Sequence, residues 1–310
     1  MKIAALILTY NRREILQECV DAVLHQKGDC RPDIIVIDNG SSDGTSDLFL
    51  PLNAPYHQKS IQYYNSGMNT GCAGGFCLGI RKAAELGYDH IWMMDDDCIP
   101  SEAALGELVR YAEAHMEEYG FLSSKVLWKD GSICEMNLQR GTVFRPLKSM
   151  TGDAIPVKMA SFASLFIPMK VIRDVGLPYK EFFIWTDDWE YTRRISKKYA
   201  CYLIPRSEMT HYIKSGSKAD IAAAAPERLE RFYYLYRNDV FLYRREGLKG
   251  FAYEAARIPA HLLRIAFSDH DMKEKIKRAN IVVKGTTEGL SFYPEPERLP
   301  AEGKAQDQRK

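Results

Sequence analysis

Short apolar runs alternate with amphipathic stretches along the first two thirds of the chain. Residues 2–9, 33–38, 61–64 and 89–94 have the length and composition expected of buried strands. Between the first two runs, apolar side chains recur at helical spacing over residues 15–24 and would cover one face of a sheet. This alternation predicts an α/β domain with a doubly wound, mostly parallel sheet flanked by helices.

The alternation continues and then gives way to helix. Further elements are expected as helices at 102–118 and 187–198 and as strands at 121–127, 161–168 and 201–205. The segment 132–155 is less regular and suits a hairpin excursion, and long helical stretches rich in Arg, Tyr and Leu follow Pro226. We therefore expect a sheet-containing domain over residues 1–215, a helical region over 216–292 and a flexible tail over 293–310.

Polar residues stand where three of these strands end. Thr9 and Tyr10 close the first run, Asp38 closes the second, and three aspartates at 95–97 follow the fourth. Because ligands of doubly wound sheets bind beyond the carboxyl ends of the strands, we expect these side chains to line one crevice.

The adjacent carboxylates of Asp95, Asp96 and Asp97 are costly to place together. Like charges repel, and each group tends to hold a proton unless a cation lies among them. Since side chains alternate along a strand, Asp95 and Asp97 are expected on one face and Asp96 on the other. Such a pair suits Mg²⁺ or Mn²⁺ bridging a diphosphate. The alternative is a solvated acidic turn, with an aspartate capping a helix that begins near Ser101.

Two segments beside these strand ends carry turn and helix-start residues. Asn11 and Glu14 are spaced as a capping box for the first helix. Residues 65–73 form a glycine-containing loop, and a helix is expected to begin near Gly74 and Gly75. The glycines do not follow the GxGxxG pattern of dinucleotide-binding loops. They permit close approach of the backbone to a ligand, or a tight turn.

Composition narrows the class of protein and its partners. The net charge of +1 gives no broad attraction for nucleic acid. The seven cysteines include no CxxC pair, which favours reduced thiols and a cytoplasmic protein over a zinc or thioredoxin-like site. The apolar run at 3–8 is far shorter than the ~20 residues of a membrane-spanning helix, and no cleavage site follows it. We interpret this run as a buried strand and not as a signal peptide.

Six segments are specific when taken together in their order. They are ILTYNR at 7–12, VIDNGSSDGT at 36–45, NTGCAGGF at 69–76, MMDDDCIP at 93–100, FFIWTDDWEYTRRI at 182–195, and His211. The set resembles the family 2 glycosyltransferases, which have the GT-A fold. The MDDD form of the aspartate motif, the AGGF loop and the FIW-x-DD-x-E-Y stretch resemble the subgroup of galactofuranosyl- and rhamnosyltransferases.

The resemblance implies an inverting, metal-dependent hexosyltransferase. It implies transfer of galactofuranose or rhamnose from a UDP- or dTDP-sugar to a hydroxyl of a polysaccharide or lipid-linked glycan. It also implies Mn²⁺ or Mg²⁺ held by Asp97 and His211 with Asp95, and Asp188 as the catalytic base. The donor contacts that it implies are Thr9, Tyr10, Asn11, Asp38, Asn69, Gly74, Gly75, Asp95 and Asp96.

Acidic and aromatic residues crowd around the implied base. Asp188 stands at a helix start, where the helix dipole favours the ionised, basic form, and Asp187 is its rival. Asp187 and Glu190 are also placed to hydrogen-bond acceptor hydroxyls; alternatively they cap the helix and pair with an arginine one turn on. Of the five aromatic residues at 182–191, we expect at least half to be packing and choose Trp185 as the acceptor contact.

The C-terminal region has no motif of its own. Its mixture of basic and apolar residues suits peripheral contact with the inner face of an anionic membrane, or a solvated amphipathic helix that covers the first domain. Two other functions stay open: a non-catalytic nucleotide-sugar-binding partner subunit, and a sugar-phosphate nucleotidyltransferase. The latter needs a glycine-rich, basic loop directly after the first strand, where residues 9–12 contain no glycine.

Overall fold

The computed structural model describes residues 1–300 apart from 59, 117 and 213–218. Two compact units make up the chain. The first, the sheet unit, comprises Met1–Lys180, Asp188–Gly216 and the chain from Pro296 onward. The second, the helical unit, comprises Glu181–Asp187 and Ser217–Glu295. The sequence suggests a boundary near residue 215, but it indicates neither the short segment before Asp188 as part of the helical unit nor the return of the chain to the sheet unit.

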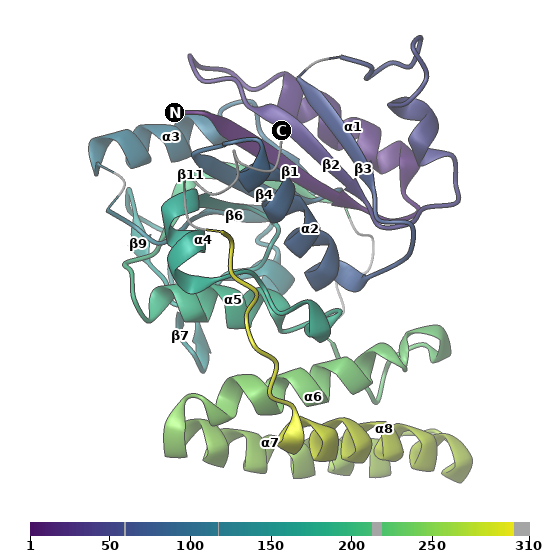
Figure 1. Ribbon diagram of the computed structural model, residues 1–310. Coiled ribbons are helices and arrows are strands. Elements are labelled where there is room, and N and C mark those ends of the chain that lie inside the picture. The colour runs from purple at the N-terminus through teal and green to yellow at the C-terminus, as the bar shows by residue number, and fades with distance from the viewer. Residues whose placement is uncertain (59, 117, 213–218, 301–310) are drawn as a thin grey trace. The chain divides into compact units, whose positions relative to one another are not determined.

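The sheet unit is built on a nine-stranded sheet with the order β3-β2-β1-β4-β10-β6-β11-β5, in which β9 also pairs with β11. Its strands are β1 (Ile3–Thr9), β2 (Asp33–Asp38), β3 (Ile61–Asn65), β4 (His90–Asp95), β5 (Cys98–Pro100), β6 (Leu122–Trp128), β9 (Ile155–Pro156), β10 (Leu165–Pro168) and β11 (Tyr202–His211). Strands β3, β2, β1 and β4 run parallel, as do β6 and β11, whereas β10 is antiparallel to both of its neighbours. The strands with polar ends therefore lie in a parallel part of the sheet (Figure 1).

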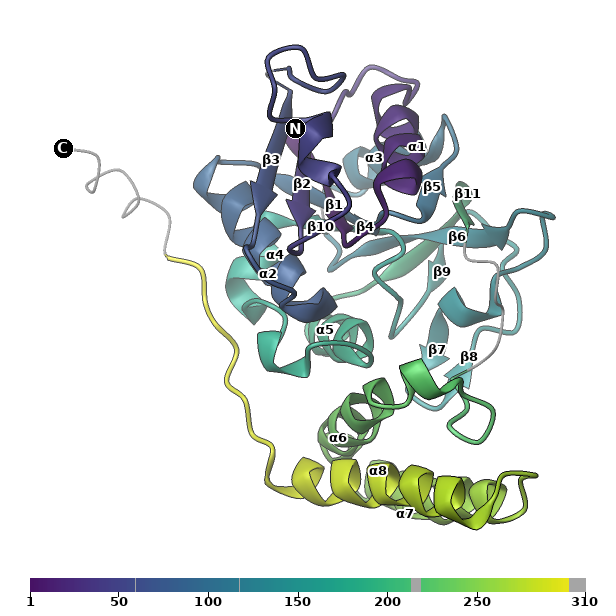
Figure 2. The ribbon, with the colours of Figure 1, turned by 90° about the vertical axis from the view of Figure 1, so that its right-hand side faces the viewer.

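Helices cover both faces of this sheet (Figures 1 and 2). One face packs against α1 (Arg13–Leu24) and α3 (Ala104–Ala114), and the other against α2 (Gly71–Glu85), α4 (Met169–Val175) and α5 (Asp187–Ser196). Side chains of β1 alternate between the two cores, beginning with Ile3 in the first and Ala4 in the second. Short 3₁₀ helices lie at Thr45–Leu48, Glu135–Asn137, Lys180–Phe182 and Pro226–Arg228.

The irregular segment between β6 and β10 forms the hairpin that its sequence suggests. β7 (Arg140–Thr142) and β8 (Arg145–Pro146) pair antiparallel in a separate two-stranded sheet. The Arg140 guanidinium lies over the Trp189 ring, 3.6 Å from its centroid. This cation–π contact ties the hairpin to α5.

Helix α2 begins one turn earlier than expected and lies close to β1. A Cβ atom at Gly75 would be 2.3 Å from Cδ1 of Leu8, and one at Gly79 would be 2.3 Å from Cδ1 of Leu6. Both glycines are therefore needed for packing. Donor contacts at Gly74 and Gly75 stay predictions.

The predicted capping box at the start of α1 is wrong. Asn11 adopts a φ of +51°, and its side-chain oxygen accepts the N–H of Ser42 at 2.7 Å. The first turn of α1 is capped from another loop instead, because the Asp43 carboxylate accepts the N–H of Arg13 at 2.9 Å. Asn11 thus joins the loops after β1 and β2, and its contact with a donor stays a prediction.

The helical unit contains three long helices, α6 (Arg231–Arg244), α7 (Gly247–Ala266) and α8 (Met272–Ser291), packed against one another. α8 approaches α6 closely at two glycines. A Cβ atom at Gly285 would lie 2.6 Å from the carbonyl oxygen of Tyr233, and one at Gly289 would lie 2.9 Å from that of Arg237. Within the described part of the chain, no helix has the length and apolar character needed to cross a membrane.

Residues 296–300 are bound to the sheet unit, so the predicted flexible tail from 293 onward is wrong for this stretch. The carbonyl oxygen of Glu297 accepts the N–H of Leu177 at 2.8 Å, and its carboxylate pairs with Arg81 at 2.6 Å. Leu299 is 8% exposed and joins a core of the sheet unit. Because these partners are distant in the sequence, no local pattern around residues 296–300 predicts that this stretch is packed. Residues 301–310 lie outside the described residues.

Replacing Gly285 with alanine is expected to lower the free energy of unfolding by about 1–3 kcal/mol, because the new methyl group meets a backbone oxygen. The sign is informative, since the same change in an exposed helix interior raises stability by about 1 kcal/mol. Urea unfolding followed by circular dichroism measures the difference. Thr287→Ala, on the exposed side of α8, is the control, and a stabilised Gly285→Ala variant would contradict the close approach of α6 and α8.

Candidate active site

The polar strand ends meet at one edge of the sheet, as predicted. In the parallel register Thr9 is paired with Asp38, and Asp38 with Asn65. On the other side of β1, Leu8 is paired with Asp95. The carboxyl ends of four neighbouring strands thus present their side chains together, and this edge is the candidate active site.

The acidic triplet spans the end of β4 and the turn that follows. β4 ends at Asp95, and Asp96 and Asp97 form the turn to β5. Asp96 accepts a hydrogen bond from the Thr9 hydroxyl at 2.7 Å. The Arg12 guanidinium forms ion pairs with Asp96, at 3.0 Å, and with Asp97. The prediction that Asp95 and Asp97 share a face apart from Asp96 is wrong, because strand alternation stops at Asp95 and the turn brings the next two carboxylates to one cation.

Burial makes this cluster electrostatically unfavourable. Asp96 and Asp97 are each 2% exposed, which excludes the alternative of a solvated acidic turn. Burial, together with Asp97 and Asp96, raises the pKa of Asp95 to about 8. Burial also raises the pKa of Asp96 to about 7, although the charge of Arg12 opposes this shift. Near neutral pH Asp95 and Asp96 therefore tend to hold protons unless more positive charge is added.

His211 lies beside the triplet as the last residue of β11, where the sequence suggests a loop. β11 pairs with β5 so that His211 is opposite Cys98, and its Nε2 atom is 3.8 Å from Oδ1 of Asp97. Burial lowers the pKa of His211, which keeps the imidazole neutral and able to bind a metal. The sequence-predicted pair of Asp97 and His211 is thus brought together.

The spacing of these groups fits a metal ion. The candidate ligand atoms of Asp97, Cys98 and His211 all lie within 4.8 Å of one another. Burial and the neighbouring carboxylates raise the pKa of the Cys98 thiol, so the sulfur stays protonated and is the poorest donor of the three. Among the described residues, Asp95 falls outside this group, although it is predicted as a ligand.

Asp38 is buried at the end of β2 and organises the adjacent loops. Its carboxylate accepts the N–H of Ser41 at 2.7 Å, the side-chain amide of Asn65 at 3.3 Å and the hydroxyl of Tyr63. Tyr10, at the same sheet edge, is 43% exposed. Contacts of Asp38 and Tyr10 with a nucleotide stay predictions.

Asn39 is a residue of the site that sequence reasoning missed. Its side-chain NH₂ group donates to Oδ1 of Asn69 at 3.1 Å and to the carbonyl oxygen of Gly71 at 2.9 Å. Its side-chain oxygen accepts the Thr70 hydroxyl at 2.8 Å. Asn39 therefore fixes Asn69, a predicted donor residue, in front of α2. Its position directly after Asp38, at the end of a predicted strand, could have indicated that Asn39 belongs to the site.

Asp188 lies in the first turn of α5 and is half-buried. Its carboxylate accepts the N–H of Trp189 at 2.7 Å. Its charge is one of the smaller causes that raise the pKa of Asp95. The charge of Asp188 therefore reaches Asp95, although the two residues are far apart in the sequence.

Glu190 is part of the fold, and its contact with an acceptor stays a prediction. It is 4% exposed and forms an ion pair with Arg194 at 2.9 Å, one turn along α5. Arg194 also donates to the carbonyl oxygens of Val175 and Leu177, at 2.9 and 3.0 Å. The Glu190 carboxylate thus balances the charge of an arginine that holds the end of α4.

The loop before α5 has an unusual backbone. Phe183, Trp185 and Thr186 each have a φ of +64°, a region that residues other than glycine rarely adopt. The side-chain amide of Asn238, on α6, donates to three carbonyl oxygens of this loop at 2.9, 3.0 and 3.2 Å. The Thr186 hydroxyl donates to Asp239 at 2.6 Å. Such a backbone persists where its surroundings enforce it, and Asn238 and Asp239, adjacent residues of α6, do so here.

Most aromatic residues around the candidate base serve packing, as expected. Trp185 meets the Phe232 ring edge-on, with centroids 4.8 Å apart. The others with packing roles are Phe182, Phe183 and Tyr191. Trp185 and Asp187, which is 5% exposed, belong to the helical unit, and their contacts with an acceptor stay predictions.

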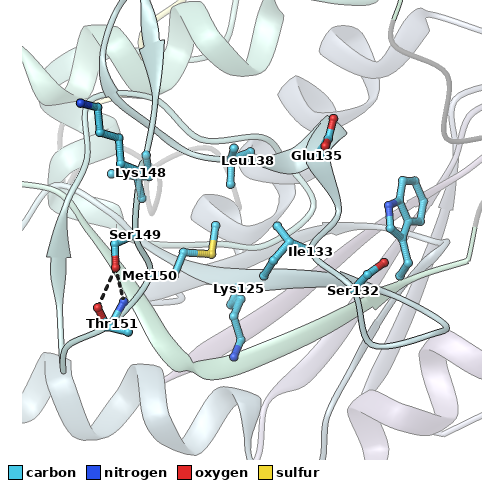
Figure 3. A pocket seen from close by; sticks show the side chains of 11 residues that line it. Lys125, Ser132, Ile133, Glu135, Leu138, Lys148, Ser149, Met150 and Thr151 are labelled. Carbon is cyan, nitrogen blue, oxygen red and sulfur yellow. Dashed lines mark hydrogen bonds between the residues drawn. The ribbon is translucent and has the colours of Figure 1, made fainter.

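A pocket of about 750 Å³ lies in the sheet unit beside the hairpin (Figure 3). Its lining includes Lys125, Trp128, Glu135 and Lys148. The ring of Trp128, one of its lining residues, also meets His211 edge-on, with centroids 5.4 Å apart. No sequence motif predicts this pocket, because its lining residues come largely from the irregular segment between β6 and β10.

Comparisons with known proteins agree with this geometry. Residues 5–123 match the family model described as Glycosyl transferase family 2. The galactofuranosyltransferase GlfT1 of Mycolicibacterium smegmatis is 29% identical over 266 residues, which cover 80% of this chain and 84% of that protein.

Two solved structures share the fold. TarS of S. aureus in complex with UDP-GlcNAc matches with a TM-score of 0.55 at 14% identity, covering 94% of this chain and 73% of that chain. GalNAc-T7 with UDP, GalNAc and Mn²⁺ matches with a TM-score of 0.58 at 14% identity, covering 84% of this chain and 55% of that one. The predicted GT-A fold is confirmed.

The metal-free protein is expected to lose stability as the pH rises from about 4 to about 8. The pKa of Asp95, about 8, lies above the ordinary value of an aspartate, so the folded state holds a proton that the unfolded chain releases. Each such proton contributes a slope on the order of 1 kcal/mol per pH unit. Urea unfolding at several pH values in EDTA measures the slope. Asp95→Asn should flatten it, and an unchanged slope in this variant would refute the assignment.

Asn238→Ala should destabilise the protein by about 1–3 kcal/mol, since three carbonyl oxygens of the loop before α5 lose their donor. Asn280→Ala, at an exposed position of α8, removes an amide of the same size and should change stability by less than about 0.5 kcal/mol. Chemical unfolding of both variants gives the comparison. Equal effects would show that Asn238 does not hold the loop.

Proposed function

The chain is a family 2 glycosyltransferase, and we propose that it transfers galactofuranose or rhamnose from a UDP- or dTDP-linked donor to a hydroxyl of a polysaccharide or lipid-linked glycan, with inversion at the anomeric carbon. The observation that supports the proposal is the meeting of Asp97 and His211 at the sheet edge where the polar strand ends gather. Galactofuranose is the first donor to test, because GlfT1 is a galactofuranosyltransferase.

A divalent cation, Mn²⁺ or Mg²⁺, fits the groups at this edge. Asp97 offers a carboxylate oxygen and His211 a neutral imidazole, a combination that favours Mn²⁺. The pKa values of Asp95 and Asp96 are raised because their ionised forms are destabilised, and an added positive charge would stabilise these forms. Arg12 supplies one such charge and would share Asp97 with the ion. When bound, the ion would balance the negative charge of the departing diphosphate.

Asp188 is the proposed catalytic base. In an inverting transfer the acceptor oxygen forms a bond to C1, while the bond between C1 and the phosphate oxygen breaks and its electron pair leaves with the nucleoside diphosphate. The proton of the acceptor hydroxyl must be taken up at the same time. Asp188 stands at the start of α5, where the helix dipole favours its ionised form, and its coupling to Asp95 supports a position near the diphosphate.

The donor would bind along the carboxyl ends of β1, β2 and β4. Support comes from the register that brings Thr9, Asp38 and Asp95 together, and from Asn69, which Asn39 fixes beside them. The pocket next to Trp128 is the proposed acceptor site. Its volume of about 750 Å³ lies within the range of small-molecule sites, and Trp128 offers a flat apolar face for a sugar ring.

A donor screen that measures released nucleoside diphosphate tests the reaction. UDP-galactofuranose and dTDP-rhamnose are offered with Mn²⁺, with Mg²⁺ and with EDTA, and turnover is expected only with metal. Asp188→Asn should lower kcat by about 10²–10⁴-fold, because the proton loses its acceptor, while the affinity for UDP stays unchanged. Asp97→Ala should weaken metal-dependent UDP binding as well.

Asp29→Asn, at an exposed position before β2, removes an acid of the same kind and should leave kcat unaltered. Full turnover in EDTA by the Asp97→Ala variant would refute the proposed metal site. Tight UDP binding without turnover for any donor or acceptor would identify the chain as a non-catalytic partner subunit.

A further inference from the structure

The polarity of α7 is the reverse of that in an ordinary surface helix. Its exposed side carries Leu248, Phe251 and Leu263, which are 89%, 61% and 56% exposed. Exposed alanines and Pro259 fill the positions between them. Helical spacing gathers these residues on one side of the helix, which a surface helix normally turns toward a core.

The buried side of α7 carries the charged residues. Glu254, the one acidic residue of this helix, is 5% exposed, and His261 is 9% exposed. Arg257 pairs with Glu254 at 3.2 Å and also with Asp239 of α6. The hydroxyl of Tyr236 is hydrogen-bonded to Nδ1 of His261 at 2.6 Å. α7 therefore buries Glu254 and His261 beside the apolar Ile265, while its largest exposed apolar side chains face outward.

α8 adds a row of lysines to an exposed apolar row. Met272, Ile276 and Val283 are each more than half exposed and lie on one side of the helix. In each case the next residue along the chain is an exposed lysine. The basic row therefore follows the apolar row along one flank of α8.

The exposed charge on these two helices is nearly all positive. Five of their exposed charged residues are basic, and one, Glu288, is acidic and accepts a hydrogen bond from Tyr233. Both helices pack against α6, so their exposed sides point away from it. The outer side of the α7–α8 pair is thus apolar and positively charged.

We propose that the outer side of α7 and α8 binds an anionic lipid surface, with both helices lying in the plane of the interface. Phe251, Leu263 and their apolar neighbours would enter the boundary between headgroups and acyl chains, and the lysines would contact lipid phosphates. Since neither helix can cross a membrane, the contact involves one leaflet. This surface goes beyond the proposed transfer reaction and does not depend on it.

A second copy of the chain could also cover the outer side of α7 and α8, but the positive charge of this surface disfavours such pairing. Two-fold pairing places the same patch of each copy against the other. The lysines of both chains would then be brought together, and like charges repel. An anionic headgroup layer has the opposite charge, and each lysine near it strengthens binding about fivefold.

Sedimentation of the full chain with lipid vesicles tests the proposal. Vesicles of phosphatidylcholine mixed with phosphatidylglycerol should bind the chain, more weakly at high salt, and vesicles of phosphatidylcholine alone should bind far less. Phe251→Ser combined with Leu263→Ser should lower the partition coefficient by about tenfold or more. Lys273→Gln combined with Lys277→Gln should lower it by roughly 25-fold.

Leu52→Ser is the matched control, because Leu52 is 89% exposed in the sheet unit, and it should bind as the wild type does. Circular dichroism checks that each variant is folded. Absence of binding, or equal binding by all variants, would overturn the proposal. A wild-type chain that is dimeric without lipid and monomeric after Phe251→Ser would overturn it in favour of a second copy. Release of nucleoside diphosphate without vesicles tests the transfer reaction separately.

Discussion

The crowding of three neighbouring carboxylates at the end of β4, two of them buried, is the constraint on which the candidate site depends. Negative charge at this density is tolerated only with compensation, and the chain supplies it locally. Arg12 pairs with two of the carboxylates, and the Thr9 hydroxyl donates to one of them. The compensation is incomplete, because the pKa of Asp95 is still raised to about 8. The carboxylates at this sheet edge therefore still favour the binding of a further positive charge.

The sheet was largely predictable because its signals are local. The run at 33–38 became β2 with the same bounds, and the rule that strand ends share an edge brought Asp38 and the triplet together. β11 was predicted too short for a physical reason. Its register shifts between Ile204 and Glu208, and beyond this irregularity Glu208, Thr210 and His211 are polar and only Met209 is apolar. A sequence pattern that stops at Pro205 therefore misses His211 as a strand residue.

The site was predictable where a motif carries the chemistry and not where packing does. Asp97 and His211 were found from motif positions, and they meet. The spacing of Glu190 in the sequence allows either a contact with an acceptor or an ion pair with an arginine one turn on. The structure is needed to show that the buried carboxylate pairs with Arg194. Asn39 and Asn238 act by hydrogen-bonding backbone groups. Because such contacts join segments far apart in sequence, no local pattern marks them.

The loop held by Asn238 has a consequence for how much of the chain the sheet unit needs around Asp188. Every motif of the family lies before residue 212, so a fragment cut there would look intact by sequence. Such a fragment would lack the amide that satisfies three carbonyl oxygens of the loop and the carboxylate that receives the Thr186 hydroxyl. The segment leading directly into Asp188 would then have to find its left-handed backbone unaided. α6 thus supplies the partners that hold the segment before Asp188, so the part of the chain that carries the motifs depends on a part that carries none.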